Sequence, residues 1–185
     1  MKKVCFFIAF IAHFQLFAQT DTLANPYARL VANSPKMQPS FKAFILNMDA
    51  NISPFVISPA RLNELINSNQ SPIILDARSL REYEVSHIKN AKRIGFDDFG
   101  SEQVWMIRRT LPVVIYCTTG DRSRILAAYL SEMGFKNIKI LDGAIIQWSN
   151  EQLPLVDKKK LKTTQIHVQK KENAALLRKG KAVWN

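Results

Sequence analysis

The chain has 185 residues, a hydrophobic content of 47% and a formal net charge of +11 at pH 7. This length fits one domain with extensions or two small domains, and the hydrophobic content excludes a largely disordered chain. No run of 18 or more apolar residues follows the first twenty positions, so no internal transmembrane helix is expected.

Residues 1–19 have the layout of a secretory signal peptide. Lys2 and Lys3 form a basic start, residues 4–17 are mostly apolar, and the small residue Ala18 precedes a polar stretch. This layout predicts cleavage near Ala18 and a periplasmic or secreted location, with no stable membrane span after cleavage. An uncleaved anchor is the alternative, but the apolar run is short for a bilayer span.

Export changes the interpretation of the two cysteines. Cys5 would leave with the signal peptide, so the mature chain would hold only Cys117 and could form no internal disulfide. Exported proteins that use cysteine structurally normally carry pairs. A single cysteine is therefore either buried and inert or kept for its chemistry.

The chain after the signal peptide divides into an N-terminal extension or linker (20–54), a domain (55–157) and a basic tail (158–185). The extension is rich in Asn, Ser and Pro and contains one short helical pattern near residues 41–48. Within the domain, short β-branched or apolar runs predict five strands, at 55–58, 72–78, 92–95, 112–117 and 137–141.

Helical patterns lie between these strands, at 58–69, 97–109, 123–135 and 143–154, with a short helical or irregular turn at 81–91. Ser58 and Pro59 are typical of a helix start. The alternation of strands and helices predicts a compact α/β domain with a parallel sheet of about five strands and helices on both faces.

The basic tail carries most of the charge excess. Residues 156–185 hold nine Lys or Arg against two acidic residues. We expect a solvated or loosely helical extension, in which residues 172–184 could form a short amphipathic helix docked on the domain. A nucleic-acid partner is not expected for an exported protein, and the charge predicts at most weak attraction to anionic membrane or envelope surfaces.

The segment Cys-Thr-Thr-Gly-Asp-Arg-Ser (117–123) joins the fourth predicted strand to a helix. Ligands of parallel sheets bind at the carboxyl ends of strands, where Cys117 is expected. Gly120 permits a tight turn that brings backbone N–H groups toward the sulfur. Arg122 and the helix N-terminus add positive charge. These features favour the thiolate, which is the nucleophilic form of cysteine.

Three motifs in order resemble those of a single rhodanese homology domain. The first holds Asp76, Arg78, Glu82, Tyr83, His87, Ile88 and Ala91; the second is the 117–123 loop; the third holds Leu141, Gly143 and Trp148. The resemblance spans about residues 55–157. Four residues separate Cys117 from Arg122, as in the sulfurtransferases, whereas related phosphatases have five.

The resemblance implies a sulfurtransferase that moves a sulfane sulfur through a persulfide on Cys117 to cyanide or a thiol. The loop residues Thr118, Thr119, Gly120, Asp121, Arg122 and Ser123 would bind the substrate or its anion. Asp76, Arg78, Glu82 and His87 would support the structure. No metal or organic cofactor is implied; the partners are small sulfur donors and thiol acceptors, with a protein persulfide partner as a further candidate.

Two alternatives remain open. The first is a non-catalytic binding module or persulfide carrier with the same fold. The second, a phosphatase or arsenate reductase, is disfavoured by loop length. For the enzyme, Thr118 stands where thiosulfate-using relatives often have arginine, and Asp121 adds negative charge. The loop therefore predicts poor use of thiosulfate and better use of a less charged donor.

Overall fold

The computed structural model describes residues 31–48 and 54–184. The predicted signal peptide and residues 20–30 of the extension lie outside these ranges. Within the described residues, no helix has both the length and the apolar character needed to cross a membrane.

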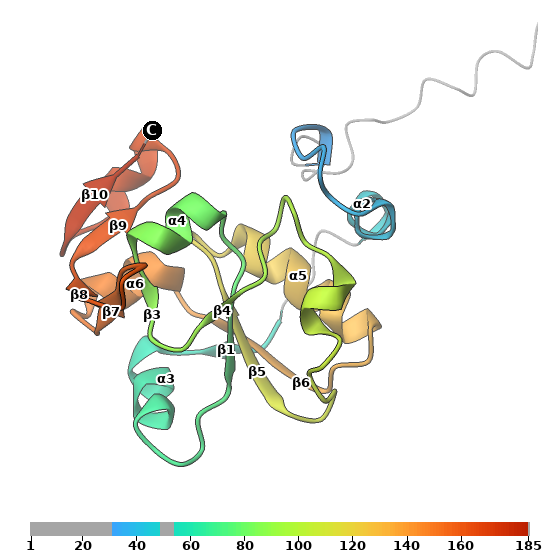
Figure 1. Cartoon of the computed structure of the whole chain (residues 1–185), viewed down its shortest axis with the longest axis horizontal. Helices are drawn as coiled ribbons and strands as arrows, with labels where there is room; N and C mark the ends of the chain where they lie inside the picture. Colours follow the sequence, from blue (N-terminus) through green and yellow to red (C-terminus); the bar gives the residue numbers. More distant parts are fainter. Residues whose placement is uncertain (1–30, 49–53, 185) are drawn as a thin grey trace, which may run out of the picture.

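A five-stranded parallel sheet forms the centre of the molecule (Figure 1). Its strands, in spatial order, are β1 (Val56–Ile57), β6 (Asn137–Leu141), β5 (Pro112–Tyr116), β2 (Ile73–Asp76) and β4 (Lys92–Arg93). Each lies within a run that the sequence predicts as a strand, so the expected α/β sheet is confirmed.

Alternation along the strands divides the core into two layers. Val113, Ile115 and Cys117 belong to one buried cluster, whereas Val114 and Tyr116 belong to the other, because successive side chains of a strand point to opposite faces. Helices α2 (Pro39–Asn47) and α5 (Asp121–Glu132) cover the first face, and α3 (Pro59–Ile66), α6 (Ala144–Asn150) and the C-terminal segment cover the second (Figure 1).

Local capping explains where two of the helices begin. Helix α3 starts as the sequence predicts, with the Ser58 side chain accepting a hydrogen bond from the Arg61 N–H. Helix α4 (Leu80–Val85) begins with a capping box between Ser79 and Glu82. It leads into β3 (His87–Ile88), which pairs antiparallel with β7 (Leu155–Val156).

The predicted helix at 97–109 is mostly absent. Only a single 3-10 turn, η1 (Ser101–Val104), forms there. Within the predicted helix, Val104, Trp105 and Ile107 would be the apolar contacts, but Trp105 is 73% exposed and its neighbour Met106 is 93% exposed. The buried side chains of this region are Phe96, Phe99 and Val104. Their spacing does not follow a helical stripe, and their packing dominates over the local helical pattern.

The helix predicted near residues 41–48 is confirmed as α2. Phe41 and Ile45 are one helical turn apart, and both are fully buried in the first cluster. This part of the N-terminal extension therefore contributes to the core of the domain.

The C-terminal tail is folded, so the expectation of a solvated or loosely helical extension is wrong. It forms β8 (Lys162–Thr163), β9 (Gln165–His167), the 3-10 helix η2 (Lys171–Leu176) and β10 (Lys181–Val183). Strand β8 extends the β3–β7 sheet across the expected boundary at residue 157, and β9 pairs with β10. Ile166 and Val168 are fully buried in the second cluster and anchor the tail.

The packing of the tail predicts a stability effect. Ile166→Ala should lower the free energy of unfolding by about 2–4 kcal/mol, because it removes methyl groups from a fully buried site. Leu161→Ala, at a 61% exposed site in the same tail, should change it by less than about 0.5 kcal/mol. Urea unfolding measures both, and equal small effects would show that the tail does not contribute to the core.

Candidate functional site

Cys117 follows β5 directly and begins the loop that leads into α5. Gly120 adopts the left-handed conformation, with φ of 113°, and this turns its N–H toward the sulfur. The distance from the Gly120 nitrogen to Cys117 Sγ is 3.1 Å. Ser123 Oγ lies 3.6 Å from the same sulfur and donates to the Gly120 carbonyl at 2.8 Å. The chain turns at Gly120, but among the described residues the Gly120 N–H is the one backbone donor to the sulfur, where the sequence predicts several.

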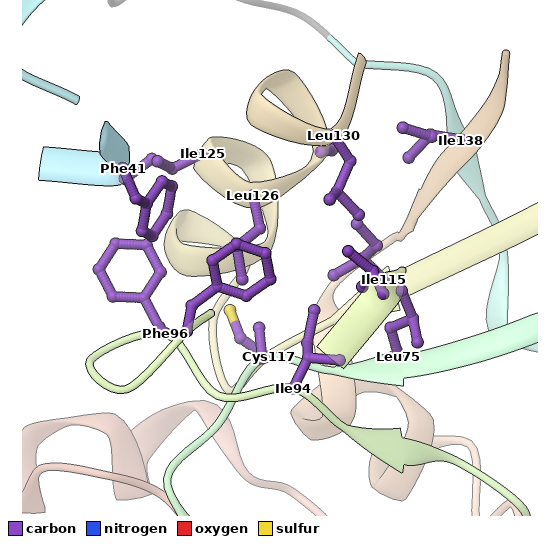
Figure 2. Packing of buried hydrophobic residues seen from close by; sticks show 14 of the residues in the cluster. Phe41, Leu75, Ile94, Phe96, Ile115, Cys117, Ile125, Leu126, Leu130 and Ile138 are labelled. Carbon is purple, nitrogen blue, oxygen red and sulfur yellow. The ribbon is translucent and has the colours of Figure 1, made fainter. Parts of the chain in front are cut away.

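The Cys117 side chain is completely buried, with 0% of its surface exposed. Figure 2 shows its sulfur pointing from the end of β5 into the apolar cluster, toward α5 and with Phe96 beside it. The Cys117 thiol is therefore both bordered by the loop and buried from solvent in this structure. A reagent can reach the thiol only if the neighbouring side chains move.

Arg122 is held by a buried ion pair with Glu82. Its Nη1 and Nη2 atoms donate to the two carboxylate oxygens at 2.9 and 2.6 Å. Thr118 Oγ1 donates to the same carboxylate at 2.6 Å and accepts from Arg122 Nη2 at 3.0 Å. The three side chains form a closed network under the loop, and the positive charge of Arg122 is neutralised within it.

The capping box of α4 positions the Glu82 carboxylate. The backbone N–H and the hydroxyl of Ser79 donate to Glu82 Oε2 at 3.0 and 2.8 Å. Burial alone would raise the pKa of Glu82, but the hydrogen bonds and charge of Arg122 outweigh burial and hold this pKa well below its usual range. Glu82 therefore stays ionised, and its pairing raises the pKa of Arg122 despite burial.

The remaining loop side chains lie at the rim. Thr119 Oγ1 donates to Asp121 Oδ2 at 3.2 Å on the surface. Next to Thr118 and Thr119, a cavity of 430 Å³ lies between the loop, α6 and the tail. Its tail wall includes Ala175, Leu176 and Arg178.

Asp76 and Arg78 form a separate, fully buried ion pair at the end of β2. Arg78 Nη2 lies 2.6 Å from Asp76 Oδ2 and donates to the Ser86 carbonyl at 2.6 Å. The guanidinium also lies 5.4 Å from the ring centroid of Tyr116. Burial raises the pKa of Tyr116 well above its usual value. This pair fastens the segment that carries α4 to the sheet.

His87 lies away from the loop thiol. Its Nδ1 is 2.9 Å from the Tyr83 carbonyl, and its ring stacks on that of Tyr83 with centroids 3.8 Å apart. Burial lowers the pKa of His87. The residues that the structure describes contain no group of three or more His, Cys, Asp or Glu side chains that could hold a metal ion.

Three features of the site are missed by the sequence reasoning. These are the pairing of Glu82 with Arg122, the aromatic side chains around Cys117, and the contribution of the tail to the cavity beside the loop. In the sequence, the phenylalanines at 41, 96 and 99 are what could have indicated the aromatic side chains near Cys117. Their contacts join distant segments, so no sequence periodicity indicates them.

The fold and the loop place the chain in a known class of domain. Residues 58–151, half of the chain, match the family model described as the rhodanese-like domain, and the chain belongs to this family. The match includes the loop and its supporting residues but excludes α2 and the tail.

Similar curated proteins are larger than this chain. It is 33% identical over 97 residues to a "tRNA uridine(34) hydroxylase" of Photorhabdus laumondii, a match that covers 49% of this chain and 27% of the relative. A protein with the same description from Hamiltonella defensa is 35% identical over 103 residues, covering 51% and 29%. The chain thus corresponds to less than a third of these relatives.

Solved structures support the fold. A Bacillus halodurans protein aligns with a TM-score of 0.55 and 19% identity, covering 66% of this chain and 90% of its own. A thiosulfate sulfurtransferase from Pseudomonas aeruginosa aligns with a TM-score of 0.52 and 19% identity, covering 56% and 20%. At this identity the likeness extends to the fold alone.

The Glu82 network predicts how stability depends on pH. A carboxylate whose pKa is lowered by folding stabilises the protein above its unfolded value of about 4.5 and loses this contribution as the pH falls below it. His87 and His167, whose pKa values burial lowers, add a loss that begins as the pH falls below about 6.5. The free energy of unfolding should therefore decrease steadily with acidification below that pH.

Glu82→Gln tests how much the charged carboxylate of Glu82 contributes to stability. It should lower the free energy of unfolding at pH 7 by about 3 kcal/mol, because the Arg122 charge stays buried without its partner. The remaining stability should fall less steeply below pH 4.5. Glu64→Gln, in an exposed pair with Arg61, is the control and should cost at most about 1 kcal/mol. Equal losses in the two variants, measured in urea across this pH range, would contradict the assignment.

Proposed function

We propose that this protein is a rhodanese-like sulfurtransferase that carries a sulfane sulfur as a persulfide on Cys117. The observation that carries the proposal is the loop itself. Gly120 directs its N–H at the Cys117 sulfur, and the Glu82 pair holds Arg122 beneath the loop. A backbone donor aimed at the sulfur stabilises negative charge on a thiolate or persulfide.

The proposed reaction has two steps. The Cys117 thiolate attacks the outer sulfur of a donor persulfide, R–S–SH. A sulfur–sulfur bond forms to Cys117 and the donor's sulfur–sulfur bond breaks. The departing thiolate takes up the proton of the transferred sulfur and leaves as R–SH, so Cys117 holds the persulfide anion. Cyanide or an acceptor thiolate then attacks the outer sulfur and displaces the Cys117 thiolate. With cyanide the products are thiocyanate and the starting enzyme, so atoms and charge balance.

The alternative is a non-catalytic binding module or persulfide carrier, and the burial of Cys117 favours it. A carrier loads one sulfur and holds it, whereas an enzyme turns over repeatedly. The hydroxylase activity named for the larger relatives is not part of the proposal, because this chain matches less than a third of each.

We further propose that the protein is exported, on the basis of the predicted signal peptide. Its partners would then be small sulfur donors and thiols, or a protein persulfide, in that compartment. The mature N-terminus, determined by mass spectrometry, tests export: a chain that still begins at Met1 would contradict it.

The sulfurtransferase proposal predicts cyanide-dependent formation of thiocyanate from a sulfane-sulfur donor over many turnovers. Cys117→Ser should reduce the rate to background, because serine forms no persulfide. Thiosulfate, a mercaptan donor and polysulfide are compared, and urea unfolding verifies that the variant is folded. Activity retained by the variant, or no turnover by the wild type with any donor, would overturn the proposal.

Donor choice depends on the rim of the loop. The Thr118 hydroxyl is buried and hydrogen-bonded to Glu82 and Arg122, so it is engaged in this network rather than free to bind a donor. An arginine at 118 would compete with Arg122 for the same carboxylate, so Thr118→Arg is not a clean test. Asp121, which is exposed, is the better position.

We expect the wild type to use thiosulfate poorly and a less charged donor better, because the charge of Arg122 is neutralised and Asp121 repels an anion. Asp121→Asn should lower the KM for thiosulfate by less than about tenfold, with a smaller effect at high salt. Glu132→Gln, at the other end of α5, is the control. Steady-state kinetics decide, and an unchanged KM in Asp121→Asn would show that the rim charge does not select the donor.

A further inference from the structure

The apolar cluster that contains Cys117 includes side chains from a segment that the family match leaves out. We name residues 31–48 the N-terminal segment and residues 96–104 the aromatic loop. Phe41 of the N-terminal segment is fully buried, and its ring lies 5.4 Å from that of Phe96 and 5.2 Å from that of Phe99. All three belong to the cluster into which the Cys117 sulfur points (Figure 2).

Hydrogen bonds fasten the N-terminal segment to the aromatic loop. Ser34 Oγ donates to Asp97 Oδ1 at 2.5 Å. The Gln38 side chain donates to Glu102 Oε2 at 3.1 Å and accepts from the Ser101 N–H at 3.2 Å. The segment and the loop are thus joined at several points, and a displacement of one would move the other.

Tyr129 of α5 makes the contact with α2: its ring lies 4.8 Å from that of Phe41 and 5.1 Å from that of Phe44, and its hydroxyl donates to Ser40 Oγ at 3.2 Å. Phe41 and Ile45 form the buried edge of α2. Beside this edge lies a cavity of 820 Å³, lined by Ser40, Ala43 and Phe44 of α2 and by Ala127, Ala128 and Ser131 of α5. A helix with a cavity beside its contact is packed less tightly than an element at the centre of the sheet. Such elements open more readily than the domain as a whole.

We propose that the N-terminal segment is a gate over Cys117. When it is docked, Phe41 holds the rings of the aromatic loop in place and the thiol is closed to solvent. When α2 and the aromatic loop move outward, the sulfur becomes accessible. The closed state would shelter a persulfide from water and small reductants, a consequence that rests on the proposed function. The gating of the thiol does not rest on it.

The gate is tested by alkylation of the full chain with iodoacetamide in native buffer, followed on the peptide that contains Cys117 so that Cys5 does not contribute. Phe41→Ala should raise the alkylation rate of Cys117 at least about tenfold, a factor that corresponds to about 1.4 kcal/mol in the opening equilibrium. Phe41→Leu, which keeps the site apolar but removes the ring contacts, should give a smaller increase and serves if the alanine variant does not fold.

Leu62→Ala is the matched control. Leu62 is also fully buried, but it lies in the cluster on the other face of the sheet. Its truncation should destabilise the domain without opening the gate. Urea unfolding gives the global stability of each variant. Alkylation that is faster in the Phe41 variants than in Leu62→Ala at the same global stability supports the gate. Equal rates in the Phe41 variants and Leu62→Ala, or no acceleration in the Phe41 variants, overturn it.

The outcome is separate from that of the sulfur-transfer assay, because iodoacetamide needs no sulfur donor. Faster alkylation of the Phe41 variants in a protein that transfers no sulfur would support the gate and refute the proposed function. Unchanged alkylation in an active sulfurtransferase would refute the gate alone.

Discussion

The buried ion pair between Glu82 and Arg122 is the constraint on which the site depends. It joins two residues 40 positions apart, one on α4 and one at the start of α5. Two buried charges are tolerated only when they are well paired, so the pair fixes how α4 and the loop sit together. Ser79 and Thr118 complete the hydrogen bonds of the carboxylate. The shape of the loop around Cys117 follows from this arrangement.

This arrangement also determines the chemical character of the site. Because Arg122 is neutralised by Glu82, the polar support for the sulfur comes from the Gly120 N–H, the Ser123 hydroxyl and the dipole of α5, and the sulfur points into an apolar cluster. Such surroundings suit a sulfur atom with a single negative charge better than a doubly charged oxyanion. The segments outside the family match, α2 and the tail, then shape the approach to the loop from its two sides.

The sequence predicts the sheet and the loop because their signals are local. The apolar runs that end at Asp76 and Cys117 are strands in the structure, and the glycine at 120 turns the chain as expected. The tail is misjudged because its many lysines indicate a solvated segment. The burial of Ile166 and Val168 depends instead on the domain surface against which they pack. The cluster around Cys117 and the partner of Glu82 are contacts between distant segments, which propensity and periodicity do not encode.

The central claim is that Cys117 carries the sulfur. Mass spectrometry of the purified protein after exposure to polysulfide or an organic persulfide, followed by removal of excess donor, tests it most directly. The account predicts one added sulfur atom on the peptide that contains Cys117, removed again by cyanide with release of thiocyanate. A peptide that gains no sulfur, although the donor reacts with a free thiol under the same conditions, would contradict it.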